Sequence, residues 1–187
     1  ASLTMTVKAV NAEGIVTQNY RQNFAKATSS LVAENNNSGT DLTPRIQQLT
    51  GGMGWVNGLS TRSVAPFWLN RAATADGPFE QVLFGLKLQD NDGNRSELAD
   101  KDQLTTAAGI CSGAACLSKV IHPETKWRYG RLQIVNALGS EQSNLPVQLK
   151  AEYWNGQQFV PHAADNCSPV EPARLLLTAG SQPVLTV

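Results

Sequence analysis

Residues 81–89 read Gln81-Val-Leu-Phe-Gly-Leu-Lys-Leu-Gln89, and the turn-forming stretch Asp90-Asn-Asp-Gly-Asn94 follows at once. Successive side chains of a β-strand point to opposite faces, so the apolar residues at alternate positions from Val82 to Leu88 share one face. Gly, Asn and Asp are residues that favour turns. The stretch therefore predicts a strand with one face in a hydrophobic core, and it indicates a β fold.

The same period of two recurs on both sides of this strand. Residues 3–9, 131–137 and 145–154 alternate apolar and polar side chains. The turn at Asn11-Ala-Glu-Gly14 predicts a hairpin whose return strand runs from Ile15 to Tyr20. About ten short strands with almost no helix favour an all-β fold, an antiparallel β-sandwich that is immunoglobulin-like. The strand order within residues 34–80 cannot be read from the pattern, and the polar stretch 96–106 has room for one or two helical turns.

A second hairpin is specified by Asn155-Gly156, which lies between two strand-like runs. Asn-Gly favours a two-residue type I′ turn, which needs a positive φ at both central positions. Alternation then places Tyr153 and Trp154 on opposite faces of the strand before the turn.

Composition excludes several classes of protein. The 187 residues carry 15 basic and 15 acidic side chains, so the formal net charge is zero, and 41% are hydrophobic. A nucleic-acid-binding domain would show a basic face, so no nucleic-acid partner is expected. The apolar content is too high for a disordered chain. No apolar run approaches the ~18 residues of a membrane span, so no membrane insertion of this segment is expected.

The chain has three cysteines, Cys111, Cys116 and Cys167. The residues between Cys111 and Cys116 are small and turn-prone, which favours a disulfide in a secreted protein; a pair of reduced thiols is the alternative. Cys167 is then left without a partner in this chain. Because residues 1–3 have neither an initiating Met nor a leader pattern, the chain is interpreted as a segment of a longer protein.

Asp90, Asp92 and Asn94 have the spacing of the first half of a calcium loop. The glutamate that completes such a loop is missing, so an ordinary polar turn is the preferred interpretation and calcium the weaker one. Both histidines lie beside prolines, and no nucleophile motif accompanies them. The sequence therefore predicts no catalytic residue, no cofactor and no enzyme activity.

The four tryptophans raise the alternative of a carbohydrate-binding module, since flat exposed rings stack on sugars. Trp154, on the polar face beside the Asn155-Gly156 turn, and Trp55, in a Gly-rich loop where it is expected to be exposed, are the candidate ligand-binding residues. Cross-strand packing is the competing role for Trp154. Trp68 and Trp127 are expected in the core.

A set of motifs at both ends of the chain resembles the C-terminal region of the MshQ-type proteins, which are encoded with mannose-sensitive haemagglutinin (MSHA) type IV pili. The motifs are Val7-Lys-Ala-Val-Asn-Ala-Glu-Gly14, Thr17-Gln-Asn-Tyr20, Asn23-Phe-Ala25, Arg128-Tyr-Gly-Arg-Leu132, Asn136-Ala-Leu-Gly-Ser-Glu141, Leu145-Pro-Val147, Ala151-Glu-Tyr-Trp-Asn-Gly156, Phe159-Val160 and Asp165-Asn-Cys-Ser168. That region is a family domain without an assigned activity. The resemblance implies a secreted or surface-attached bacterial protein, exported across the inner membrane, that takes part in pilus biogenesis or adhesion. Pilus or cell-surface components and glycans are its implied partners.

The Arg128-Tyr-Gly-Arg131 motif is also where a domain boundary is predicted. Residues 1–128 are expected to form the immunoglobulin-like sandwich, and residues 129–187 a second β unit or an extension of the first. The residues expected to be buried in the sandwich are Val7, Ala9, Phe84, Leu86 and Leu88.

Overall fold

The structure is a computed structural model that describes residues 3–48, 54–64, 67–90, 98–104, 106–109, 111–140, 142–144, 146–166 and 168. Its regular elements are strands, together with three 3₁₀ turns of three residues each. No described helix combines the length and the apolar character that crossing a membrane requires. The chain divides into two compact units, Ala1–Tyr129 and Gly130–Val187, and each unit is described by itself.

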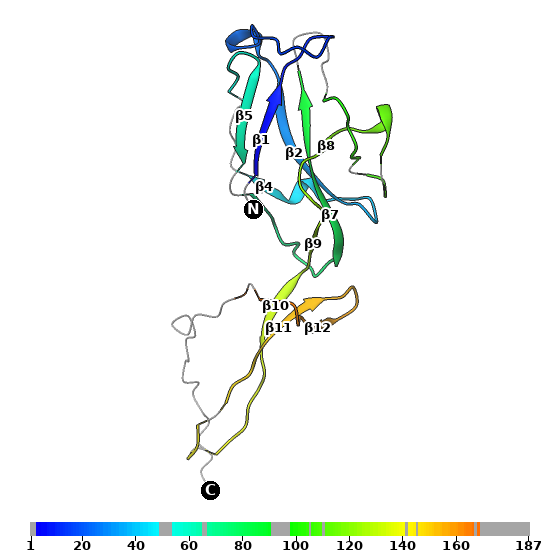
Figure 1. The fold of residues 1–187 in the computed structure, drawn as a ribbon. Coiled ribbons are helices and arrows are strands. Elements are labelled where there is room, and N and C mark those ends of the chain that lie inside the picture. The colour runs from blue at the N-terminus through cyan, green and yellow to red at the C-terminus, as the bar shows by residue number, and fades with distance from the viewer. Residues whose placement is uncertain are drawn as a thin grey trace. The chain divides into compact units, whose positions relative to one another are not determined.

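The first unit contains nine strands and the three 3₁₀ turns among the described residues (Figure 1). They are β1 (Leu3–Lys8), η1 (Gln22–Phe24), β2 (Thr28–Asn35), β3 (Thr40–Asp41), η2 (Thr43–Arg45), β4 (Ile46–Gln48), β5 (Leu59–Val64), β6 (Phe67–Leu69), β7 (Phe79–Gln89), η3 (Gly113–Ala115), β8 (Lys119–Val120) and β9 (Thr125–Trp127). All pairing between them is antiparallel. The largest sheet has the order β3-β2-β7-β8, with β9 also paired to β7, and β1-β5 and β4-β6 form two-stranded sheets.

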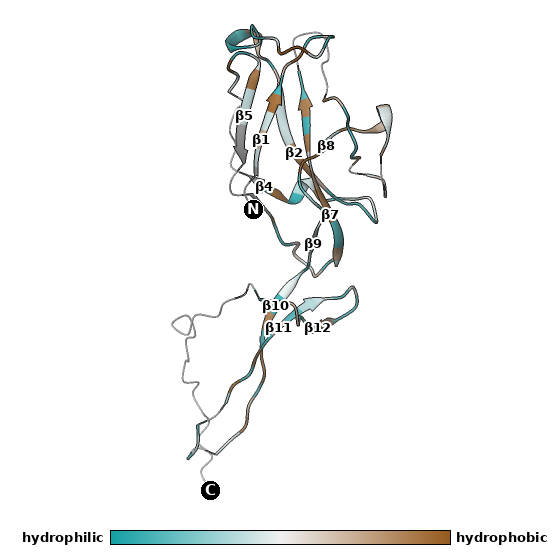
Figure 2. Cartoon of the chain, in the orientation of Figure 1, coloured by the Kyte–Doolittle hydropathy of each residue, from teal (hydrophilic) through white to brown (hydrophobic). Residues whose placement is uncertain are grey.

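The hydrophobic core lies on the inner face of the β2–β7 pair. Its buried residues are Leu31, Ala33, Leu42, Val82 and Phe84. Met5 of β1, Ile46 of β4 and Leu69 of β6 pack against this cluster from the smaller sheets. Figure 2 shows the brown apolar positions along β1, β2 and β7 that supply these contacts. The prediction of an antiparallel, all-β sandwich is therefore confirmed.

The strand that decided the fold class extends from Phe79 to Gln89, and Phe84 and Leu86 are buried as expected. Val7, Ala9 and Leu88 were expected to be buried as well, and that prediction is wrong: they are only half-buried. The physical reason is that all three line a pocket, which is described below.

A buried polar network fixes residues 102–104 against the main sheet, where the sequence left room for a helical turn. Gln103 instead forms an isolated antiparallel β-bridge with Ser118, and the residue is only 1% exposed. The Gln103 amide donates to the Leu83 carbonyl at 3.3 Å and accepts from the Ser118 hydroxyl at 3.1 Å. It lies flat on β7 because Gly85 has no side chain there: a Cβ atom at Gly85 would come within 1.6 Å of Gln103 Oε1.

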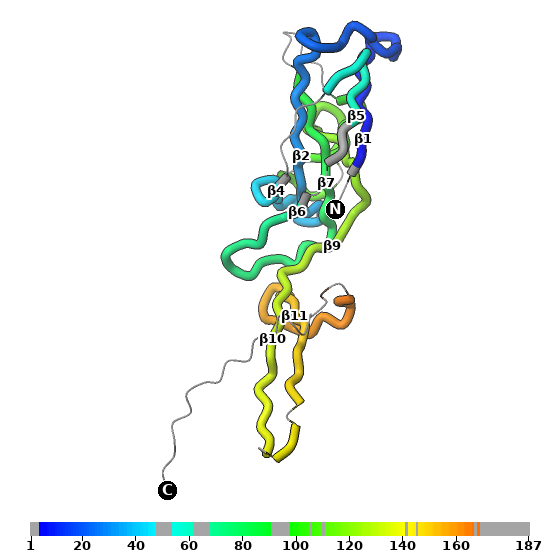
Figure 3. Tube along the Cα trace, turned by 90° about the vertical axis from the view of Figure 1, so that its left-hand side faces the viewer, coloured from blue at the N-terminus to red at the C-terminus, as the bar shows by residue number. Residues whose placement is uncertain are grey.

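The second unit contains β10 (Gly130–Ile134), β11 (Leu149–Trp154) and β12 (Phe159–Pro161). These strands form one antiparallel sheet in the order β10-β11-β12, so the expected additional β unit at the C-terminal end is present. The tube in Figure 3 lets the reader follow β10 into β11 through the long connection between them. Cys167 and the strand-like runs at 174–178 and 183–187 lie outside the described residues.

The hairpin at Asn155-Gly156 forms, but its turn differs from the predicted type I′ geometry. Of the two residues, only Gly156 has a positive φ, +103°. The Asn155 side-chain oxygen accepts hydrogen bonds from the backbone N–H groups of Gln157 and Gln158. This side-chain capping lets Asn155 keep an ordinary backbone conformation and moves the centre of the turn by one residue. Tyr153 and Trp154 lie on opposite faces, as alternation predicts.

Replacing Gly156 by valine is expected to destabilise the second unit by about 1 kcal/mol or more, because a β-branched residue is strained at positive φ. Urea unfolding followed through the Tyr153 and Trp154 resonances measures the change. Gln157→Val is the matched control, since Gln157 has no positive φ, and it should cost less. Equal losses for the two variants would contradict the strain argument.

Candidate functional site

A pocket of about 260 Å³ lies in the first unit. Residues at the ends of β1 and β7 line it, and these two strands finish at the same end of the sandwich (Figure 1). Its apolar wall comes from β1 and the residues just after it, from β7 and from nearby connections. The lining residues with apolar side chains are Val7, Ala9, Val10, Ala27, Leu88, Leu98 and Ala99. The polar or aromatic lining residues are Lys8, Thr17, Tyr20, Trp55 and Asp90.

Tyr20 reaches the pocket because the first hairpin ends early. Residues 15–20 were predicted as a full return strand, but pairing stops at the single bridge between Val10 and Val16. The chain then turns, with the Tyr20 N–H donating to the Thr17 carbonyl at 3.0 Å. Gly58 donates its N–H to the Tyr20 carbonyl at 3.1 Å, which holds the turn in place. The turn carries the Tyr20 ring into the pocket wall instead of along a strand.

Tyr20 and Asp90 form the polar centre of the pocket. The Tyr20 hydroxyl donates to Asp90 Oδ2 at 2.7 Å and accepts from the Ala27 N–H at 2.9 Å. Burial, followed by the hydrogen bond to Asp90, raises the pKa of Tyr20 from 10.0 to about 12. The hydroxyl therefore keeps its proton at every physiological pH, and it holds the Asp90 carboxylate in one orientation.

Trp55 packs edge-on against Tyr20, with the ring centroids 4.7 Å apart and the planes at 81°. It was expected to be exposed in its Gly-rich loop, and this expectation is wrong: the residue is only 9% exposed. The aromatic pair removes its ring from water, which a loop composition alone does not reveal. Trp55 thus cannot act as a flat surface platform, but it does line the pocket.

Two buried polar atoms of residues that line the pocket, each with almost no accessible surface, have no hydrogen-bond partner among the described residues. One is Asp90 Oδ1, an acceptor on a residue that is 5% exposed, and the other is the Trp55 indole Nε1, a donor. Buried polar groups are nearly always paired, so two unpaired atoms of opposite kind in one pocket wall are unusual. Four other buried polar atoms among the described residues also lack a partner, but none of them belongs to a residue that lines this pocket.

Trp154, the other predicted ligand-binding residue, lies in the second unit. Its ring packs against Phe159, the residue paired with it across β11 and β12, with centroids 5.4 Å apart. The Arg131 guanidinium lies 3.8 Å from the Phe159 ring centroid and also pairs with Glu152 at 2.8 Å. Trp154 is therefore a half-buried member of a cross-strand cluster, the packing role that sequence analysis named as the alternative.

Of the two tryptophans expected in the core, only Trp127 packs against it. Trp127 is half-buried and packs against the core, where the Arg45 guanidinium lies 4.7 Å from its ring centroid. Trp68 was also expected in the core, but it is 46% exposed. Its indole N–H donates to Gln47 Oε1 at 2.8 Å across the β4–β6 pair, which satisfies the ring at the surface.

The calcium alternative depends on residues that the structure leaves undescribed, since Asp92 and Asn94 lie outside the described ranges. Asp90 is described, and its Oδ2 is already bound by Tyr20. Within the described ranges, no three acidic, histidine or cysteine side chains gather as a metal site would require.

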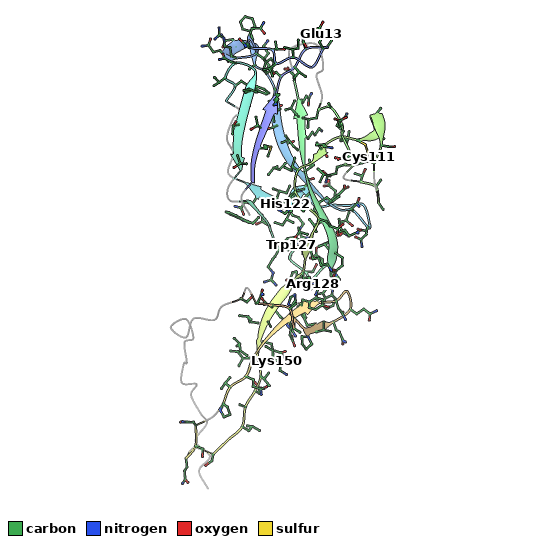
Figure 4. The ribbon with its side chains drawn as sticks, viewed as in Figure 1. Glu13, Cys111, His122, Trp127, Arg128 and Lys150 are labelled. Carbon is green, nitrogen blue, oxygen red and sulfur yellow. A yellow bond between two sulfur atoms is a disulfide. The ribbon has the colours of Figure 1, made fainter. Side chains whose placement is uncertain are left out.

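The Cys111–Cys116 disulfide is formed, with the two Cα atoms 5.6 Å apart. Its loop contains η3. Cys116 is fully buried, whereas Cys111, which is labelled in Figure 4, is partly accessible. The crosslink lies directly before the Leu117–Ser118 segment that pairs with Gln103. It therefore anchors the connection that carries the buried polar network.

The sequence singled out Trp55 and Asp90 separately, but no pattern in it indicated that the two residues lie near each other. Tyr20 was visible only as part of a motif, because nothing in the local pattern links it to a carboxylate seventy positions away. The usable signal was the alternation at the end of the first strand, which puts Val7 and Ala9 on the same face.

Two family models match the chain. Residues 1–117 match the model described as DUF6701, third domain, and residues 128–185 match DUF6701, fourth domain. Neither a curated protein nor a solved structure matches the chain significantly.

Proposed function

Because this chain belongs to the DUF6701 family, with matches to its third and fourth domains, we propose that it is a non-catalytic, β-rich part of an exported bacterial surface protein. We further propose that this protein acts in the biogenesis or adhesion of MSHA-type type IV pili. The single observation that carries the proposal of export is the Cys111–Cys116 disulfide. The link to pili rests on the motif resemblance given above.

The Cys111–Cys116 disulfide supports export. Disulfides persist in the periplasm and outside the cell, and are rare in the reducing cytosol. Cys116 is completely buried, so its sulfur is part of the folded interior of the first unit. A crosslink built into the interior in this way is consistent with a protein that folds after translocation.

The surroundings of the titratable groups support a non-catalytic role. His122 packs edge-on against Phe84, and its Nδ1 lies 2.7 Å from the Pro123 carbonyl (Figure 4). His162 packs edge-on against Tyr153 in the second unit. Each histidine is thus held by a neighbouring ring. A general base would instead have to be poised beside a nucleophile.

Carbohydrate binding is the alternative function, and one observation favours it. Neither candidate tryptophan presents a fully exposed flat ring to a sugar, because Trp55 is buried and Trp154 packs on Phe159. Trp55 nevertheless lines a pocket with an unpaired indole N–H and a carboxylate. The candidate carbohydrate site is therefore this pocket and not a flat surface.

The proposal of export predicts that Cys111 and Cys116 are oxidised in the bacterium that encodes the chain. Cells are quenched with acid, and free thiols are blocked with an alkylating reagent before any reduction. Neither Cys111 nor Cys116 should then be open to alkylation. An epitope inserted at the exposed Glu13 turn should bind antibody on intact cells (Figure 4). Alkylated Cys111 and Cys116, with no antibody binding until cells are permeabilised, would contradict export.

Pilus association is tested separately, by an in-frame deletion of residues 1–187 from the encoding gene. The deletion strain should lose pili or attachment, and the intact gene supplied in trans should restore them. Normal piliation and attachment in the deletion strain would refute the pilus part while leaving export untouched.

A further inference from the structure

The two unpaired atoms of the pocket wall differ in what they need. Asp90 Oδ1 is an acceptor and needs a donor, whereas the Trp55 indole N–H is a donor and needs an acceptor. Leaving a buried polar group unpaired is unfavourable, because the group has lost its hydrogen bonds to water. A molecule that satisfies both atoms would therefore recover a substantial free energy on entering the pocket.

The chemistry of the two atoms selects among ligands. An ammonium group only donates, so it would pair with Asp90 and leave the indole N–H unpaired. A carboxylate or phosphate only accepts, and it would bring a second negative charge beside Asp90. A hydroxyl group both donates and accepts, so neighbouring hydroxyls on one ligand can serve both atoms.

Tyr20 pairs with one oxygen of the Asp90 carboxylate and leaves only the other without a partner. Its hydroxyl occupies Asp90 Oδ2 at 2.7 Å, so Oδ1 is the oxygen left for a ligand. The Ala27 N–H fixes the Tyr20 oxygen from the other side at 2.9 Å. Because both partners are held before a ligand arrives, the Tyr20–Asp90 pair keeps its orientation while the groups that cover Oδ1 are displaced.

The rest of the pocket suits a small ring with one apolar face. The half-buried Val7, Ala9 and Leu88 provide apolar contact, and the Trp55 and Tyr20 rings extend that wall. A volume of about 260 Å³ is large enough for one hexose-sized ring and too small for an oligosaccharide.

We propose that the pocket formed by Tyr20, Trp55 and Asp90 binds a single hydroxyl-bearing ring, such as the terminal residue of a glycan. Its hydroxyls donate to Asp90 Oδ1 and accept from the Trp55 indole N–H. This inference deepens the carbohydrate alternative and rests on it, but it does not depend on export or on pili. Because both atoms are shielded from bulk water, the ligand must displace covering side chains, and millimolar affinity is expected.

Nuclear magnetic resonance of the full, ¹⁵N-labelled chain tests the proposal directly. The chain has four tryptophans, so it gives four indole N–H signals, and Trp55→Phe identifies the one from Trp55. The probes are the methyl glycosides of glucose, galactose and N-acetylglucosamine, with butylammonium and acetate as charged comparators. At least one glycoside should move the Trp55 signal saturably and leave the Trp154 signal in place.

Variants separate binding from folding. Asp90→Asn should weaken glycoside binding at least tenfold. The single amide oxygen would still accept from Tyr20, so the side chain would present an NH2 donor at the position where the ligand hydroxyl needs an acceptor. Trp154→Phe, on a ring in the other unit, should leave the affinity unchanged. If Asp90→Asn does not fold, the wild-type titration still decides, since it needs only the assigned indole signals.

Three results would overturn the proposal. The first is a Trp55 signal that no glycoside moves, which would mean that the pocket holds only water. The second is an equal or larger response to butylammonium, which would make it a cation site. The third is full glycoside affinity in folded Asp90→Asn, which would place binding elsewhere. None of these results bears on the oxidation state or surface location of the chain, so the two proposals fail independently.

Discussion

Replacing Gly85 by alanine is expected to lower the free energy of unfolding of the first unit by about 2–4 kcal/mol. The added Cβ would lie within 1.6 Å of Gln103 Oε1. The Gln103 side chain is almost fully buried, so it has no nearby space into which to rotate. Moving it breaks the hydrogen bonds to the Leu83 carbonyl and the Ser118 hydroxyl inside the protein.

A double-mutant cycle makes this expectation specific. Gln103→Ala empties the space above Gly85, so Gly85→Ala should cost less than half as much in that background. Gly54→Ala is the matched control, because a Cβ there meets no atom within 4 Å, and it should change stability little. Urea unfolding is followed by fluorescence in a Trp154→Phe background, so that only first-unit tryptophans report. Equal costs of Gly85→Ala with and without Gln103 would refute the steric explanation.

Stability of the first unit is expected to fall by about 1–3 kcal/mol between pH 4.5 and pH 7 because of Glu34. Glu34 is 1% exposed, and its Oε2 has no partner among the described residues. Burial raises its pKa from 4.5 to about 7; a hydrogen bond with Gln103 opposes the rise, and the Asp41 carboxylate, opposite in the β2–β3 register, adds to it.

The sign follows from which state holds the proton. Between pH 4.5 and pH 7 the unfolded chain loses the Glu34 proton while the folded protein keeps it, so the stabilisation present at acidic pH is lost as pH rises. Glu34→Gln keeps the shape without the proton and should flatten this slope. Thermal unfolding of both proteins from pH 4 to pH 8 gives the comparison. Parallel curves for wild type and variant would show that Glu34 does not titrate in this range.

The parts of the fold that could be predicted are those set by local alternation. Residues 81–89 alternate so regularly that their strand and its buried face were predictable, and β7 forms the centre of the main sheet. The Asn155-Gly156 hairpin was located correctly for the same reason. Its turn type was not, because the Asn155 side chain replaced a backbone conformation that propensity alone would assign.

The pocket and the buried network could not be predicted, because both depend on long-range pairing. Gln103 lies in a polar stretch that shows no burial signal, and only the absence of a side chain at Gly85 makes room for it. Trp55 lies in a loop composition typical of exposure, yet Tyr20 covers it from a turn thirty-five positions earlier. Single-sequence patterns report neighbours along the chain, and these contacts join residues that are neighbours only in the fold.

The second unit buries few side chains, and this affects how it would respond to a pulling force. Among its described residues none is fully buried, and its side-chain contacts, such as those of Arg131 with Glu152 and Phe159, join residues that are exposed or half-buried. Segments with few buried contacts open at the lowest cost. When modules are pulled in series, this one is expected to unravel before the sandwich does. At 3.3–3.6 Å per extended residue, Gly130–Val187 would lengthen to roughly 200 Å of chain and would relieve the applied force while the sandwich stays folded.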